Sequence, residues 1–219
     1  MKRLLCISVL ALLLFNSCIV KSIQPFYTTK SLKFDKIVIG NWEDNKKRQW
    51  EFKSFKEEWK KENEDPTKLM KEDLEAYERY KEGYLVKYTR RSNEALFIGM
   101  PFKIDNHLFI DFTPFQYESD DLNPLIAQHL LKTHSVAFVG IDNQKNITLK
   151  WLSEKAMNHL INNDKLRLKH ERTGIDEDLI LTATSEELSS FLKKFISSDG
   201  DYKWDNDDTF TLKAINAKP

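Results

Sequence analysis

Cysteine is the residue of this chain best suited to covalent chemistry, and its placement is uneven. Cys6 and Cys18 both lie within the first 18 of 219 residues, and the rest of the sequence contains none. Two basic residues start the chain, an apolar run follows over 4–15, and the small residue Ser17 stands just before Cys18. This order of charge, apolar stretch and small residue is typical of an export signal. The run is shorter than the roughly 20 residues of a transmembrane helix, so we expect removal of the segment rather than membrane spanning.

The tetrapeptide Phe-Asn-Ser-Cys at 15–18 resembles the lipobox of bacterial lipoproteins. In that family the cysteine becomes the first residue of the mature chain and carries fatty acyl chains such as palmitate. The resemblance implies a signal peptide at 1–17 and lipidation of Cys18. The alternative is an ordinary secretory signal whose apolar stretch ends near this cysteine.

The resemblance also implies a location. Ile19 follows the cysteine, whereas an aspartate there holds some lipoproteins in the inner membrane. We therefore expect a lipid-anchored protein of the cell envelope in the outer membrane, on either its periplasmic or its surface side. Bacterial lipoproteins of this kind include many without an assigned activity, so the resemblance implies a place rather than a mechanism.

Composition narrows the choice of partners. Loss of Lys2 and Arg3 with the signal would leave 32 basic against 34 acidic residues. Such a balance argues against nucleic acid as a partner, since nucleic acid demands a basic surface. It also argues against a polybasic hold on anionic lipid. We expect residues 18–34 to form a lipidated tether and 35–219 a single globular domain.

Apolar alternation predicts an antiparallel β structure. Its clearest example is 95–104, where every second residue is apolar. Further strands are expected at 36–42, 50–53, 84–88, 108–112, 137–141, 147–151, 166–171, 179–182 and 209–215. Short alternating strands favour antiparallel pairing. The predicted fold class is α+β, an antiparallel β-sheet or partly closed β-barrel with several inserted helices packed on it.

Two turns can be predicted from the requirement that apolar rows share a face. A three-residue loop at 105–107, with Asn106 or His107 left-handed, would pair Ile104 with Leu108. A loop at 142–146 would likewise pair Ile141 with Ile147.

Cap residues predict helices between the strands. Asn123-Pro124 precede a helix over 125–132, Ser153 caps a helix to Ile161, and a Thr184–Glu187 capping box precedes 188–196. The segment 56–82 carries seven basic and ten acidic residues. It predicts a charged helical insertion with Met70, Leu74 and Tyr77 on one stripe, and alternatively an arm that docks an envelope protein partner.

A second resemblance concerns Gly40-Asn41-Trp42. It is similar to the Gly-x-Trp that starts lipocalin-type barrels, where the tryptophan closes the base of the barrel. This implies a carrier with an apolar ligand inside. Aromatic residues expected to line such an interior are Trp50, Phe52, Tyr84, Tyr88 and Phe102.

Other patterns fail on their context. Asp-Asn-Asp-Asp-Thr at 205–209 matches a phosphatase nucleophile motif by letter, but no buried strand precedes it. As a calcium loop starting at Asp199 it places Lys203 and Trp204 where an oxygen ligand and glycine are required. Five scattered histidines give no zinc set. We expect no metal, no cofactor and no catalytic residue, and Asp111 as a solvated acid on an outer face.

The sequence therefore predicts a lipid-anchored envelope protein that acts as a non-catalytic binding or structural module. The alternative functions are a lipocalin-like carrier of an apolar small ligand and an unrecognised hydrolase whose site is dispersed along the chain. No ligand-binding residue can be assigned from the sequence.

Overall fold

A closed β-barrel with helices packed outside it forms the body of the protein. The computed structural model describes residues 19–63, 69–116, 130–200 and 202–215. The barrel order is β11-β2-β3-β4-β5-β6-β7-β8, and every pairing in it is antiparallel. The predicted α+β class is confirmed, with a barrel that closes completely.

The elements have the following bounds. The barrel strands are β2 (Gly40–Asp44), β3 (Gln49–Ser54), β4 (Tyr84–Arg90), β5 (Asn93–Ile104), β6 (His107–Gln116), β7 (Ser135–Ile141), β8 (Ile147–Trp151) and β11 (Thr209–Ala214). A separate sheet consists of β1 (Lys21–Ser22), β10 (Asp178–Leu181) and β9 (His170–Thr173). The helices are η1 (Thr29–Ser31), η2 (Lys36–Val38), α2 (Phe55–Glu62), α3 (Lys71–Tyr80), α5 (Glu154–Asn162) and α6 (Ser185–Ser197).

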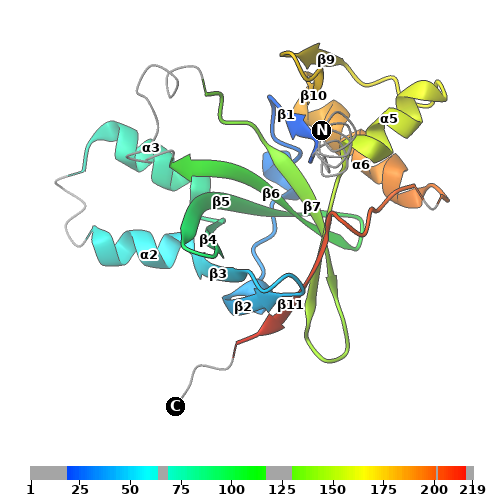
Figure 1. Cartoon of the computed structure of the whole chain (residues 1–219). Helices are drawn as coiled ribbons and strands as arrows, with labels where there is room; N and C mark the ends of the chain where they lie inside the picture. Colours follow the sequence, from blue (N-terminus) through cyan, green and yellow to red (C-terminus); the bar gives the residue numbers. More distant parts are fainter. Residues whose placement is uncertain (1–18, 64–68, 117–129, 201, 216–219) are drawn as a thin grey trace, which may run out of the picture.

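Figure 1 shows helices on two sides of the barrel. The pair α2 and α3 lies beside β3 to β5, whereas α5 and α6 lie with β1, β9 and β10 at the other side, near one end of the molecule. The turn between β7 and β8 projects from the opposite end.

The β5–β6 hairpin differs from the prediction. Ile104 pairs with His107, so the turn contains only Asp105 and Asn106, and Asp105 is the left-handed residue with φ of 51°. The predicted three-residue loop and the Ile104–Leu108 pair are therefore wrong.

The reason is that this hairpin is buried on both faces. Phe102 and Phe109 pack outward against α6 and the β1–β10 sheet, while Leu108 and Ile110 point into the barrel. A two-residue turn places the apolar rows of the two strands on opposite faces. Because both faces are buried here, neither row is exposed to solvent.

The β7–β8 hairpin confirms its prediction. Ile141 pairs with Ile147, Val139 with Leu149, and Ala137 with Trp151. Asp142 holds the turn by accepting hydrogen bonds from the backbone N–H groups of residues 144 and 146, both at 2.8 Å.

Helix caps also follow the sequence. Ser153 Oγ accepts from Ala156 N ahead of α5. Thr184 and Glu187 form the predicted capping box of α6. Most of the helix predicted over 125–132 lies outside the described residues, and its last residues, 130–132, are not helical.

Three strand predictions require adjustment. Residues 36–38 form the 3-10 helix η2 rather than the start of a strand. The strand predicted at 166–171 begins only at His170, as β9. Both β9 and β10 lie outside the barrel.

The segment expected to be a tether is part of the folded body from Ile19 onward. Val20 and Phe26 are fully buried, and β1 pairs in parallel with β10. The tether prediction is wrong over 19–34, because this segment is rich in apolar side chains that pack in or against the core: Ile19, Val20, Phe26, Tyr27, Leu32 and Phe34. Cys18 itself lies outside the described residues.

The described parts of the charged segment 56–82 contain α2 and α3, as the predicted helical insertion between β3 and β4 requires. Phe55 and Trp59 of α2 stack at 5.7 Å between ring centroids, and Trp59 meets Tyr77 of α3 at 5.8 Å. Met70 and Leu74 of the predicted stripe remain 66% and 42% exposed. Aromatic residues, not the predicted aliphatic ones, attach this insertion to the barrel.

Candidate functional site

A groove on the helical side of the molecule is the best-formed candidate for a ligand site. It holds about 580 Å³ and lies between α6 and the segment 163–168 that follows α5. The segment leaves α5 through a hydrogen bond from Lys165 N to Leu160 O at 2.9 Å and then runs without a strand partner toward β9. The side of the groove formed by residues 163–168 is therefore an irregular segment and not part of a β-sheet.

Apolar side chains form the floor of the groove. They come from α5, the 163–168 segment, α6 and the stretch after it: Leu160, Leu166, Leu168, Phe191, Phe195 and Tyr202. Phe195 meets Tyr202 edge-on at 6.5 Å. Such a volume and such a lining are typical of small-molecule sites.

Charged side chains line the rim in both signs. The cations are Lys165, Arg167 and Lys194, and the acids are Asp164, Glu186 and Glu187. Glu187 is already engaged, since Thr184 N donates to its carboxylate at 2.9 Å and this bond lowers the pKa of Glu187. None of the three cations forms an ion pair within the part of the chain that the structure describes. The rim can therefore offer cationic groups to an acidic ligand.

Four of the five aromatic residues expected to line a barrel cavity, Trp50, Phe52, Tyr84 and Tyr88, instead fill the interior themselves. Trp50 contacts Tyr88 at 4.7 Å and Phe52 at 6.3 Å between centroids, and Phe52 meets Tyr84 at 6.1 Å. Phe102 lies on the outer face of β5, stacked on Phe109. A ligand inside the barrel would have to displace these rings, so the interior is not where we place the site.

Trp42 of the Gly-x-Trp segment lies in the barrel core. Its Nε1 donates to Val38 O at 2.9 Å, which ties η2 to the first barrel strand. Gly40 has φ of 139°, a conformation that favours glycine, and the Trp42 ring lies within 4 Å of where a Cβ would be.

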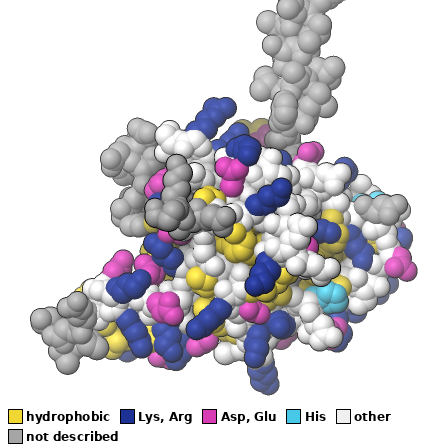
Figure 2. All heavy atoms as spheres, turned by 90° about the horizontal axis from the view of Figure 1, so that it is seen from below, with side chains coloured by type: hydrophobic (Ala, Val, Ile, Leu, Met, Phe, Trp, Pro, Cys, Tyr) yellow, Lys and Arg dark blue, Asp and Glu magenta, His cyan; other side chains and the backbone are white. Residues whose placement is uncertain are grey.

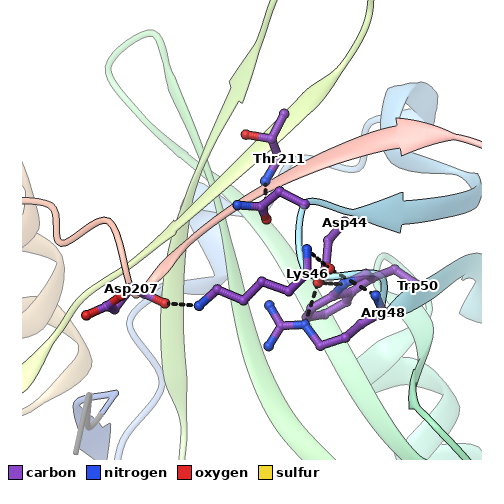
Figure 3. A network of polar contacts seen from close by, with 7 residues as sticks. Asp44, Lys46, Arg48, Trp50, Asp207 and Thr211 are labelled. Atoms are coloured by element: carbon purple, nitrogen blue, oxygen red, sulfur yellow. Dashed lines mark hydrogen bonds and ion pairs between the residues drawn. The ribbon is translucent and has the colours of Figure 1, made fainter. Parts of the chain in front are cut away.

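A buried polar network lies at one end of the barrel, beside the β2–β3 turn (Figure 3). Asp44 accepts hydrogen bonds from the backbone N–H groups of Lys46 and Arg48, from Arg48 Nε at 2.7 Å and from Trp50 Nε1 at 3.0 Å. The Arg48 guanidinium lies 4.0 Å from the centroid of Phe210. Burial alone raises the pKa of Asp44, but the four hydrogen bonds outweigh it and hold the pKa below 3.8. All four donors come from the β2–β3 turn and the start of β3, which indicates a structural role for Asp44.

The second buried carboxylate corrects a prediction. Asp111 is on the outer face of β6, as expected, but it is fully buried rather than solvated. His134 Nδ1 lies 2.7 Å from Asp111 Oδ1, and Phe26 N donates to Oδ2 at 2.8 Å. The N-terminal segment covers this face, which the alternation of a single strand could not indicate.

An Asp–His pair raises the question of nucleophilic catalysis. A triad needs the carboxylate on one imidazole nitrogen and the nucleophile on the other. Here the hydroxyl of Thr113 lies 2.9 Å from His134 Nδ1, the same nitrogen that faces Asp111. The three residues therefore do not form a nucleophile–base–acid arrangement.

Metal chemistry has no visible centre in this part of the chain. Across residues 19–63, 69–116, 130–200 and 202–215 no group of three or more His, Cys, Asp or Glu side chains could hold an ion. In the acidic segment after α6, Asp205 pairs with Lys155 at 2.8 Å, and Lys46 Nζ donates to Asp207 O. These residues order a turn before β11, as the sequence indicated.

The protein is an eight-stranded antiparallel barrel with an outer layer of helices, and the groove lies in that outer layer. Comparison with family models, with curated proteins and with solved structures gives no match. Among the described helices, none is long and apolar enough to span a membrane.

Proposed function

We propose that this chain is a lipid-anchored, non-catalytic binding module of the cell envelope, held in the outer membrane through lipid on Cys18. The anchor is supported by the export signal and the lipobox-like tetrapeptide at 15–18. The binding role is supported by one structural observation, the groove of about 580 Å³ beside α6.

The groove favours a ligand with an apolar body and an acidic end. Leu166, Leu168 and Phe191 offer apolar contact, and Arg167 and Lys194 lie at the rim without ion-pair partners among the described residues. A fatty acid or a similar anionic amphiphile has this chemistry. A carrier role, inferred in the sequence from Gly-x-Trp, would therefore use the groove in the outer helical layer and not the barrel interior.

Titration with a fluorescent fatty acid tests this role. We expect Arg167→Glu combined with Lys194→Glu to weaken binding about tenfold, since a hydrogen bond to a charged group contributes roughly 1.5–3 kcal/mol. Arg90→Glu on β4 combined with Lys213→Glu on β11 makes the same change in charge at distant exposed positions and is the matched control. Equal affinity for all three proteins would show that the groove is not the site.

Intact mass of the membrane-extracted protein tests the anchor. The expected product begins at Cys18 and carries the added mass of acyl chains. An unmodified N-terminus, or a chain that begins at any other residue, would contradict lipidation.

A second candidate function is docking of another envelope protein through the 56–82 insertion. The supporting observation is the exposure of Leu74 on α3 and of Met70, the N-cap residue of that helix. Crosslinking in intact cells should give an adduct that disappears in a Met70→Gln, Leu74→Gln variant and persists in a Glu72→Gln control. Identical adducts in all three would remove this candidate.

A further inference from the structure

Ile19, the residue after the proposed lipid attachment point, already belongs to the folded body. Ile19 forms a β-bridge with Ser153, the N-cap residue of α5. Val20 is fully buried, and its N–H donates to Leu152 O at 2.9 Å. One residue spans at most about 3.6 Å, so almost no chain separates Cys18 from the folded body.

Several contacts hold this start of the chain in place. Ser22 and His134 exchange backbone hydrogen bonds, both at 2.8 Å. Lys21 pairs with Asp178, and Phe26 N donates to the buried Asp111. Peeling the segment away to make a flexible spacer would expose Val20 and Phe26 and break the hydrogen bond from Phe26 N to Asp111, which is costly.

We infer that the lipid anchor has no spacer and holds the protein directly against the bilayer surface in a fixed orientation. The inference rests on the proposed lipidation of Cys18. The start of α5 and the adjoining turn at 205–208 then lie at the lipid headgroups, because Trp151 N donates to Asp208 O beside the Ile19–Ser153 bridge.

The opposite end of the barrel points away from the membrane. Strand β8 runs from Ile147 to Trp151, a length of roughly 16 Å, and the β7–β8 turn lies at its far end. Figure 1 shows this turn and the α5 end of the molecule on opposite sides.

The basic residue near the anchor is not free to bind anionic lipid headgroups. At the anchored end Lys155 is paired with Asp205. Figure 2 shows the other end of the molecule, seen from below, where lysine and arginine side chains lie interspersed with acidic ones. The acyl chains contribute affinity for the bilayer of about 0.8 kcal/mol per buried methylene.

Single-cysteine labelling tests the orientation. The processed chain would contain no cysteine other than the acylated Cys18, so an introduced thiol is the only one free to react. A fluorophore is attached at Lys155→Cys, near the anchor, or at Asn143→Cys, on the β7–β8 turn. Lipidated protein from cells is reconstituted into vesicles of phosphatidylethanolamine and phosphatidylglycerol that carry a contact-range quencher on the headgroup.

The expected result is several-fold stronger quenching at position 155 than at 143. A third protein carries twelve Gly/Ser residues inserted between Cys18 and Ile19, which reach about 20 Å and should remove most of that difference. Lipid mass with equal quenching at both positions would overturn the fixed orientation alone. Absence of lipid mass would overturn the proposed anchor and this inference with it.

Discussion

Asp111 of β6 holds the N-terminal segment against the barrel, because its Oδ2 accepts a hydrogen bond from Phe26 N at 2.8 Å. Its other oxygen, Oδ1, lies 2.7 Å from His134 Nδ1. We expect Asp111→Ala to lower the free energy of unfolding by roughly 2–4 kcal/mol, because the buried Phe26 N–H loses its acceptor and His134 Nδ1 loses its partner. Urea unfolding measures this, with the exposed Asp176→Ala as control. A loss no larger than in the control would contradict the role given to Asp111.

Acid sensitivity should depend on Asp44. Its pKa in the folded protein is below 3.8, so the stability it contributes is present above that value and is lost as pH falls through the lower, folded pKa. The urea midpoint should therefore decline below about pH 4. We expect Asp44→Asn to be less stable at pH 6 and to show a shallower decline. Parallel pH profiles for the two proteins would rule out this assignment.

A matched pair of tryptophans separates hydrogen bonding from packing in the barrel. Trp42 Nε1 donates to Val38 O, whereas the buried Nε1 of Trp151 has no partner among the described residues. Trp42→Phe leaves that carbonyl unpaired, so it should cost about 1 kcal/mol more than Trp151→Phe. Chemical denaturation of both variants measures the difference, and the reverse order would count against it.

The cap of α6 offers a further test. Thr184 Oγ1 accepts from Glu187 N, and Glu187 returns a carboxylate acceptor to Thr184 N. Thr184→Ala should lower the free energy of unfolding by about 1 kcal/mol. Ser185→Ala, one residue inside the helix, should change it by much less. The same loss in both variants would assign the effect to something other than the cap.

The pairing register of a strand could be predicted from the sequence where only one face of the strand is buried, but not where both faces are. β8 alternates buried and half-buried residues, so its register with β7 could be read from the apolar pattern alone. Residues 98–102 of β5 are buried without interruption. For such a strand the rule that apolar rows share a face gives no answer, and the turn at Asp105 was mispredicted for that reason.

Long-range contacts account for the other differences. β1 has only two residues, too few to show a period, and its burial depends on β10, more than 150 positions later. Asp111 reads as a solvated acid until the N-terminal segment covers it. The groove combines residues around 160–168 with others around 186–202, and no local motif marks either part.

The β5–β6 hairpin belongs to two apolar clusters at once, since Phe102 and Phe109 face the helical layer while Ile110 and Phe112 face the barrel. Unfolding of either cluster would expose one apolar face of β5 and β6 to solvent. The barrel and its outer layer should therefore melt in a single cooperative transition, and a fragment cut between them would lack a complete core on either side.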